Sequence, residues 1–352
     1  SVPVFRDFIC LSVDNAELLG APLTTGTAMD QALNRRCDDL ERAGGRLCLL
    51  IPYDALTLLR ASFSAPKLLH TLRASPCSGH PALEKFDGQL KTCVSQICNT
   101  DLTDLQWIQA SLPVRNGGLG IRRVSSLAPS AFLASAAGTR DLQDKILSNS
   151  QAPEDSAVNQ VLVQWAVRFN TDEVTCPVGA TAGIQREWDR PCIAADVSTL
   201  MSSLPERRQQ ARLLALSAPH SGDWLHALPI SACGLRLDDE AVRVAVGLRL
   251  GSKLCEPHQC PCGAQVSPEG THGLACRRSS GRTTRHHALN DLVWRSLVQA
   301  DIPSIKEPAG LFRSDGKRPD GLTQIAELYL ATTSNVGGAA AEGAASRRSE
   351  ER

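Results

Sequence analysis

Three cysteines and one histidine lie close together in the last third of the chain, at a spacing that suits a metal ion. Cys260, Cys262, His272 and Cys276 form the pattern C-x-C-x9-H-x3-C. Two close thiols, followed by an imidazole and a thiol on a second short arm, can surround a tetrahedral zinc ion. The pattern therefore predicts a structural Zn²⁺ site built from these four side chains.

The spacing alone leaves alternatives open. Cys255 and His258 are near enough to serve as ligands, although Cys255 ends a helical pattern and His258 flanks Pro257. A C-x-C pair is also tighter than most structural zinc sites, so four reduced side chains without a metal form the alternative interpretation.

A turn and a run of positive charge surround the four residues. Cys260-Pro261-Cys262-Gly263 is typical of a tight turn, because proline fixes φ and glycine permits the reversal. No acidic residue occurs between Glu269 and Asp291. A zinc-pinned loop beside a basic strip can hold a phosphate backbone. The candidate nucleic-acid contacts are Arg277, Arg278, Arg282, Arg285 and His286.

Apolar residues recur at helical spacing in most of the chain, which predicts a mainly α fold with small α+β parts. The expected helices cover 33–47 (interrupted at Gly44-Gly45), 56–63, 83–97, 127–137, 158–169, 198–217, 239–250 and 289–298. Short strands are expected at 8–13 and 17–23. Thr103 or Asp104 can cap a short helix, and Asp238 begins an acidic first turn that suits a helix dipole.

The segment Asn116-Gly117-Gly118-Leu119-Gly120 is rich in glycine, as phosphate-binding loops are. It lacks the strand-loop-helix context and the Lys-Ser/Thr pair of a nucleotide site. We therefore interpret it as a structural turn.

Composition limits the classes of protein to which the chain can belong. Its 352 residues suggest two or three domains, and its 37 basic residues balance 37 acidic ones, so nucleic-acid contact must come from a local patch. The 13 scattered cysteines, the missing signal segment and the missing apolar run predict an intracellular, reducing compartment and no membrane contact. No small-molecule substrate is evident, and the sequence does not indicate an oligomeric state. The chain begins with Ser1, which suggests a processed chain or a fragment.

Several segments together resemble one family. The run from Trp107 to Ile121 resembles the segment after the thumb of non-LTR retrotransposon reverse transcriptases, and Leu18-Leu19-Gly20 resembles the strand after the polymerase palm. The zinc pattern resembles the C-terminal half of that family, as do three further segments: Leu248-Arg249-Leu250-Gly251, the Gly281–His286 run and Arg318-Pro319-Asp320. In that family this half is a zinc knuckle followed by a restriction-like endonuclease.

The resemblance implies a division of the chain and a nuclear location if the protein acts with its parent element. The expected parts are a thumb-like helical region (1–147), a linker (148–155), a helical connector (156–251), a zinc knuckle with its basic strip (252–287), a truncated mixed α/β nuclease remnant (288–333) and a disordered tail (334–352).

Neither catalytic site of that family is complete here. The Asp-Asp pairs, Asp38-Asp39 and Asp238-Asp239, have helical contexts and are expected to be surface or capping charges rather than polymerase metal ligands. For the nuclease, Glu307 and Asp320 are the candidate carboxylates for Mg²⁺. No further Asp follows Asp320 and no further Lys follows Lys317, although Glu327 is a possible substitute acid. Taken alone, Asp320 before Gly321 is typical of a turn.

We expect a nucleic-acid-binding fragment of a retrotransposon RNA-directed DNA polymerase and endonuclease, without either activity by itself. One alternative is a helical scaffold in which zinc only staples the loop. A second alternative is a Mg²⁺-dependent DNA endonuclease that uses Glu307, Asp320 and Glu327.

Overall fold

The structure, a computed structural model, describes residues 12–147, 155–168, 176–279, 281–311, 319–323 and 329–330. It is mainly helical, as expected, and divides into two compact units, Ser1–Leu254 and Cys255–Arg352. The expected linker (apart from Asp155), the expected tail, Phe8–Leu11 of the first expected strand, and Glu327 lie outside the described residues. Helices on both sides of the expected linker belong to unit 1, and the functional names given to the parts stay predictions.

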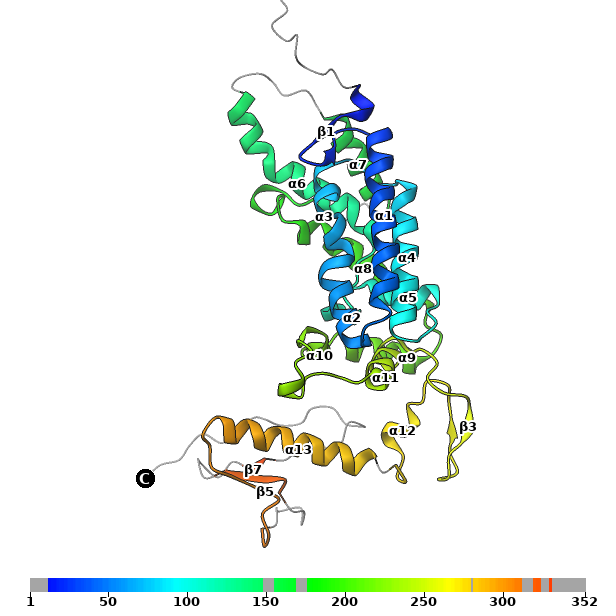
Figure 1. The fold of residues 1–352 in the computed structure, drawn as a ribbon, viewed down its shortest axis with the longest axis vertical. Coiled ribbons are helices and arrows are strands. Elements are labelled where there is room, and N and C mark those ends of the chain that lie inside the picture. The colour runs from blue at the N-terminus through cyan, green and yellow to red at the C-terminus, as the bar shows by residue number, and fades with distance from the viewer. Residues whose placement is uncertain are drawn as a thin grey trace, which may run out of the picture. The chain divides into compact units, whose positions relative to one another are not determined.

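Unit 1 is built almost entirely from helices (Figure 1). Its short strands are β1 (Glu17–Leu18) and β2 (Ala21–Pro22). Its α-helices are α1 (Thr27–Leu47), α2 (Pro52–Leu58), α3 (Ala65–Ala74), α4 (Pro81–Ile97), α5 (Asp104–Ser111), α6 (Val124–Leu147), α7 (Ser156–Val167), α8 (Gln185–Ser203), α9 (Arg207–Leu216), α10 (Asp223–His226) and α11 (Asp239–Leu250). Its other helical turns are η1 (Val13–Asn15), the π-helical η2 (Leu59–Phe63), η3 (Val114–Asn116), η4 (Gly179–Thr181) and η5 (Ser231–Cys233).

The main core lies between α1 and α6, with apolar residues of α11 joining it. Helices α1 and α4 run side by side (Figure 1). A Cβ on Gly44 of α1 would lie 2.5 Å from the Cys93 sulfur of α4, so glycine permits the close approach of the two helices. The expected interruption at Gly44-Gly45 is therefore wrong: α1 continues through both glycines because packing offsets their low helix propensity.

The expected strand at 17–23 is also wrong. Strands β1 and β2 form a two-stranded antiparallel hairpin, with Leu18 opposite Ala21. Leu19 and Gly20 connect them with φ values of 52° and 77°, the positive pair that a tight hairpin turn requires. Val13, at the end of the first expected strand, lies in the 3₁₀ turn η1 instead.

A proline divides the segment 198–217, which we expected to be one helix. Helix α8 ends at Ser203 and α9 begins at Arg207. Pro205 lacks a backbone N–H and disfavours helical geometry at Leu204, whose φ and ψ are −85° and 112°. The expected single helix is therefore replaced by two.

The glycine-rich segment is a structural turn, as expected. A Cβ on Gly118 would lie 2.0 Å from the Leu112 carbonyl oxygen, so no larger residue fits without a backbone shift. The buried Arg249 guanidinium donates to the carbonyl oxygens of Gly118 (2.9 Å), Val114 (2.7 Å) and Ser221 (3.1 Å). The turn thus directs carbonyl oxygens toward the Arg249 guanidinium. A phosphate-binding loop would instead direct N–H groups toward an anion.

The expected helix caps are confirmed. Thr103 and Gln106 form a reciprocal capping box at the start of α5. Asp238 accepts a hydrogen bond from the Ala241 N–H at the start of α11. Asp38 and Asp39 lie on α1, on its outer surface, which agrees with their interpretation as helix charges.

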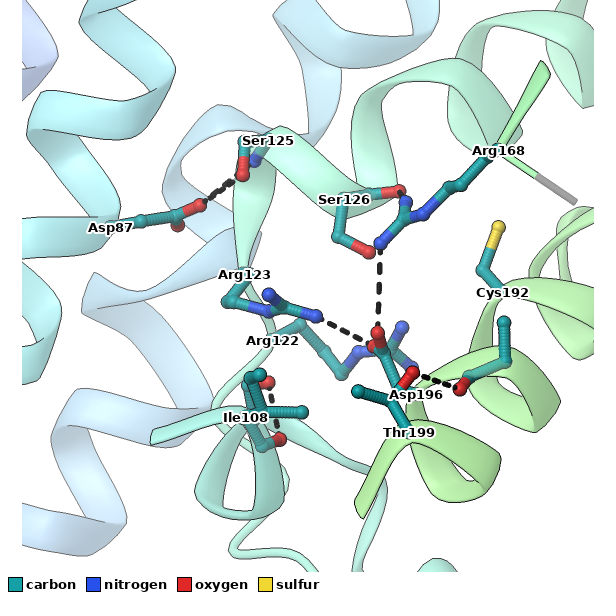
Figure 2. A network of polar contacts seen from close by, with 12 residues as sticks. Asp87, Ile108, Arg122, Arg123, Ser125, Ser126, Arg168, Cys192, Asp196 and Thr199 are labelled. Carbon is teal, nitrogen blue, oxygen red and sulfur yellow. Dashed lines mark hydrogen bonds and ion pairs between the residues drawn. The ribbon is translucent and has the colours of Figure 1, made fainter. Parts of the chain in front are cut away.

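Buried polar groups fix the start of α6 in unit 1. Asp87 of α4 accepts hydrogen bonds from the backbone N–H of Val124 (2.7 Å) and from the N–H and hydroxyl of Ser125. Its burial raises the pKa of this carboxyl group to about 6. Figure 2 shows Arg123 and Arg168 converging on Asp196 of α8. These ionic contacts tie α6 and α7 to α8.

In its described residues, unit 2 has one long helix, α13 (Gly281–Gln299), and otherwise short elements. The short elements are β3 (His258–Gln259), β4 (Gln265–Val266), α12 (His272–Ala275), β5 (Ser304–Lys306), β6 (Gly321–Thr323) and β7 (Tyr329–Leu330). Strands β3 and β4 form one antiparallel hairpin, and β5, β6 and β7 form an antiparallel sheet in that order. Helix α13 packs on β5.

Candidate metal centre

A hairpin and its turn position the first two candidate ligands. The Cys260 N–H donates to the Ala264 carbonyl oxygen (2.9 Å), and the Gly263 N–H donates to that of Cys260 (2.8 Å). Gly263 has a φ of 91°, which glycine adopts without strain. The turn expected at Cys260–Gly263 is present, and it places both sulfurs at the end of the β3–β4 hairpin.

A single helical turn positions the other two ligands. His272 begins α12, and the Cys276 N–H donates to its carbonyl oxygen (2.9 Å). Residues four apart on a helical turn share one face. The x3 spacing between His272 and Cys276 therefore aims both side chains at the hairpin.

The four donor atoms fit a tetrahedral ion. The Cys260 and Cys276 sulfurs are 3.6 Å apart, and the Cys262 sulfur lies 3.2 Å from the His272 Nε2. All four donor atoms lie within 4.8 Å of one another. A zinc ion with bonds of about 2.3 Å to sulfur and 2.0 Å to nitrogen separates its ligand atoms by roughly 3.5 to 3.8 Å. The Cys/His cluster could therefore bind a metal ion.

The electrostatics of the two close thiols favour a thiolate. The backbone N–H of Ala264 and the neighbouring thiol of Cys260 lower the pKa of Cys262 to about 6. The pKa of Cys260 is raised: a hydrogen bond from the Cys262 N–H lowers it, but desolvation and the neighbouring thiols outweigh that bond. At neutral pH the pair therefore offers one ready thiolate, the form that binds a metal ion.

The alternative ligands Cys255 and His258 do not reach this cluster. The Cys255 sulfur lies 3.5 Å from the Ser267 carbonyl oxygen, and the His258 Nδ1 lies 2.9 Å from that of Glu256. Neither residue belongs to the cluster of donor atoms that lie close together. The geometry thus favours Cys260, Cys262, His272 and Cys276 as the ligands.

The arginines beside the cluster are exposed, and two of them also brace it. Arg278 donates to the Pro261 carbonyl oxygen (2.8 Å), inside the ligand turn. Arg285 donates to the Leu274 carbonyl oxygen (2.9 Å) of α12 and to that of Gly281 (3.1 Å). Arg277, which follows the ligand Cys276 directly, is exposed. The Arg282 side chain lies outside what the structure describes.

His286 lies beside carboxylates, which differs from its expected role as a nucleic-acid contact. Its Nε2 is 3.4 Å from an Asp320 oxygen and 3.9 Å from a Glu307 oxygen. The cause is the strand register, because Lys306 of β5 pairs with Gly321 of β6 and the Glu307 N–H donates to the Asp320 carbonyl oxygen (3.0 Å). The two expected nuclease carboxylates are thus neighbours, facing α13.

The sequence reasoning missed His287. Its Nδ1 lies 3.4 Å from the same Glu307 oxygen, and His286, His287 and Glu307 form a second group of close metal-binding atoms. The His286-His287 pair was a visible signal, but its acidic partners lie 20 and more residues away in the sequence. Only the pairing of β5 with β6 brings them together.

The chain matches no known family model and no curated protein sequence. In the part of the chain that the structure describes, every helix is too short or too polar to cross a bilayer. We therefore infer function from the two clusters of candidate metal ligands and the charges around them.

Proposed function

We propose that residues 255–287 form a zinc-centred module that binds DNA or RNA, in a fragment of a non-LTR retrotransposon polymerase and endonuclease. The observation that carries the proposal is the Cys/His cluster, whose four donor atoms lie within 4.8 Å, with exposed Arg277 and Arg278 following its last ligand. A metal ion held by four residues would fix the backbone from which these arginines extend.

The arginines keep donors for phosphate. A guanidinium has five N–H donors in a fixed fork. Among the described contacts, Arg278 donates one hydrogen bond to Pro261, and Arg285 donates two, to Gly281 and Leu274. Both residues are exposed, so their other N–H groups can reach an anion while the braced ones hold the side chains in place. Pre-ordered cations lose less entropy when they bind a phosphate backbone.

The proposal assigns no polymerase or nuclease activity to this chain by itself. Asp38 and Asp39 lie on α1, and Asp238 is occupied as the cap of α11. Both Asp-Asp pairs thus lie on or at the start of a helix. In the part of the chain that the structure describes, no other two adjacent aspartates could hold the metal ions of a polymerase.

Binding of the chain to duplex DNA over a series of salt concentrations tests the proposal. With three or four phosphate contacts, the logarithm of the binding constant falls with the logarithm of the salt concentration with a slope of roughly −3 to −4. Arg277→Gln should make this slope shallower by about one. Arg295→Gln is the matched control, because Arg295 is an exposed arginine of α13 far along the helix from the cluster. Binding that does not change with salt, or an equal loss in both variants, would refute the proposal.

One observation favours a second function, a zinc-stapled scaffold. Arg278 and Arg285 both brace the ligand loop through carbonyl oxygens. If bracing is their only role, Arg285→Gln should release zinc to a chelator faster than the parent chain does. The parent chain should also bind no DNA or RNA at low salt. Retention by the parent chain, lost in Arg277→Gln with the zinc content unchanged, supports the first function instead.

A further inference from the structure

A second cluster of metal-binding side chains lies in unit 2, apart from the Cys/His cluster. Helix α13 supplies His286 and His287 and the end of β5 supplies Glu307, and their donor atoms lie within 4.8 Å of one another. Asp320, just before β6, lies outside this group but 3.4 Å from the His286 Nε2. The resemblance implies Mg²⁺ at Glu307 and Asp320. Magnesium prefers oxygen ligands and water in octahedral geometry, and two imidazoles beside the carboxylates do not suit it. The donor set and the implied ion therefore disagree.

We propose that His286, His287 and Glu307 bind a first-row transition-metal cation of the zinc class, with Asp320 as an acidic neighbour of His286. Imidazole and carboxylate together suit Zn²⁺ and similar borderline ions. The metal would join α13 to the end of β5, so its role is to hold the helix on the sheet. This proposal does not depend on the function of the Cys/His cluster.

The distances are those of ion pairs, and they also suit ligands of one shared ion. His286 to Asp320 is 3.4 Å, His287 to Glu307 is 3.4 Å and His286 to Glu307 is 3.9 Å. Direct hydrogen bonds between such groups span about 2.7 to 3.2 Å. Ligand atoms at about 2.1 Å from one tetrahedral ion are roughly 3.4 Å apart. The 3.4 Å distance from His287 to Glu307 equals such an edge, and the 3.9 Å distance from His286 to Glu307 is about 0.5 Å longer, so the three groups could share one ion.

The surroundings hold Glu307 in place for this role. Glu307 has a φ of 47°, a left-handed conformation that costs a non-glycine residue free energy. The nearly buried Asn290 of α13 places its amide nitrogen 3.5 Å from the same Glu307 oxygen that faces His287. Metal-binding carboxylates commonly have such an outer partner. Two imidazoles and one amide thus surround a single carboxylate oxygen.

The ligands differ in exposure, which allows a clean experiment. His287 is the most exposed of the three, at 53% of its side chain, so His287→Gln should leave the fold intact. Glu307→Gln keeps the shape of the side chain and removes its charge. His220→Gln is the matched control, because His220 is an exposed histidine beside Asp223 in unit 1.

The test is the zinc content of the whole chain, measured by native mass spectrometry at rising free zinc. The protection of cysteine thiols against alkylation is followed in parallel, so that loss of zinc from the Cys/His cluster is detected separately. We expect two zinc ions in the parent chain and in His220→Gln. In His287→Gln and Glu307→Gln we expect the affinity of the second ion to fall at least about 100-fold, more than loss of an outer-shell partner causes, with thiol protection unchanged.

Three outcomes would overturn the proposal. The first is a parent chain that binds no zinc beyond the ion that protects the thiols. The second is a second zinc ion that both variants retain at full affinity. The third is displacement of the second zinc by millimolar Mg²⁺, which would indicate a carboxylate site without imidazole ligands.

Discussion

The two units of the chain are held together in different ways. In unit 1, apolar side chains from α1 to α6 and from α11 form one buried cluster, and buried polar groups such as Asp87 and Arg249 are hydrogen-bonded inside the unit. In unit 2, the buried apolar side chains among the described residues are Val266, Cys276, Pro308 and Pro319, and Cys276 belongs to the Cys/His cluster. Buried apolar side chains hold unit 1 together, whereas unit 2 gathers its side chains mainly around candidate metal ligands.

This difference predicts which unit depends on a metal ion for its stability. A fully buried side chain of the size of valine or leucine contributes about 1.5 to 3 kcal/mol, while ordering each residue costs a comparable amount. Unit 1 buries dozens of such side chains, but unit 2 cannot offset its ordering cost in that way. We infer that metal binding supplies the stability of unit 2, whereas unit 1 folds without it.

The largest expected effect is the loss of unit 2 alone. Replacing Cys260 and Cys262 together by serine should remove zinc binding, which in structural sites is linked to about 10 kcal/mol or more of folding free energy. Limited proteolysis should then cut within residues 255–311 and leave unit 1 whole. Serine replacing Cys48 and Cys233, two exposed cysteines of unit 1, is the control and should change neither unit. Equal resistance of both units in the Cys260/Cys262 variant would contradict the comparison.

The next effect concerns the pH dependence of unit 1. Because burial raises the pKa of Asp87 from 3.8 to about 6, folded unit 1 binds a proton more readily than the unfolded chain does. Its free energy of unfolding should therefore fall as the pH rises from about 4 to about 6, by at most about 3 kcal/mol. Urea unfolding followed by tryptophan fluorescence measures this change.

Asp87→Asn should remove this part of the pH dependence. Asp141→Asn, which replaces an exposed carboxylate on α6, should leave it unchanged. The interpretation of Asp87 would be wrong if parent and Asp87→Asn lost stability equally over this pH range.

The smallest effect distinguishes two adjacent glycines of α1. A Cβ at Gly44 would meet the Cys93 sulfur at 2.5 Å, whereas a Cβ at Gly45 would meet nothing within 4 Å. Gly44→Ala should therefore destabilise unit 1 by about 1 to 3 kcal/mol through overpacking. Gly45→Ala should stabilise it by up to about 1 kcal/mol, since alanine favours the helix. Thermal unfolding of both variants checks the opposite signs.

The sequence predicted those features of unit 1 that depend on near neighbours. The Thr103–Gln106 capping box and the apolar face of α4 need only residues within a few positions, and both are present. The continuity of α1 depends on Cys93, which is 49 residues from Gly44, so local propensity gave the wrong expectation there. The turn at Leu19-Gly20 was missed because leucine rarely adopts a positive φ.

The same distinction holds for the two clusters of unit 2. The Cys/His ligands come from a hairpin and one helical turn, so their sequence spacing was sufficient to identify them. The second cluster depends on the β5–β6 register and on the unusual backbone of Glu307. Neither can be read from local pattern, which is why His286 was expected to contact nucleic acid and His287 was not singled out.

Hydrogen exchange of the intact chain, with and without a strong zinc chelator, tests the central claim most directly. We predict that the chelator abolishes the protection of backbone amides in residues 255–279, including the Cys260 and Cys276 N–H groups that are hydrogen-bonded in the cluster. Amides of α1 and α4 should keep their protection. A zinc-free chain that still protects residues 255–279 would contradict the account.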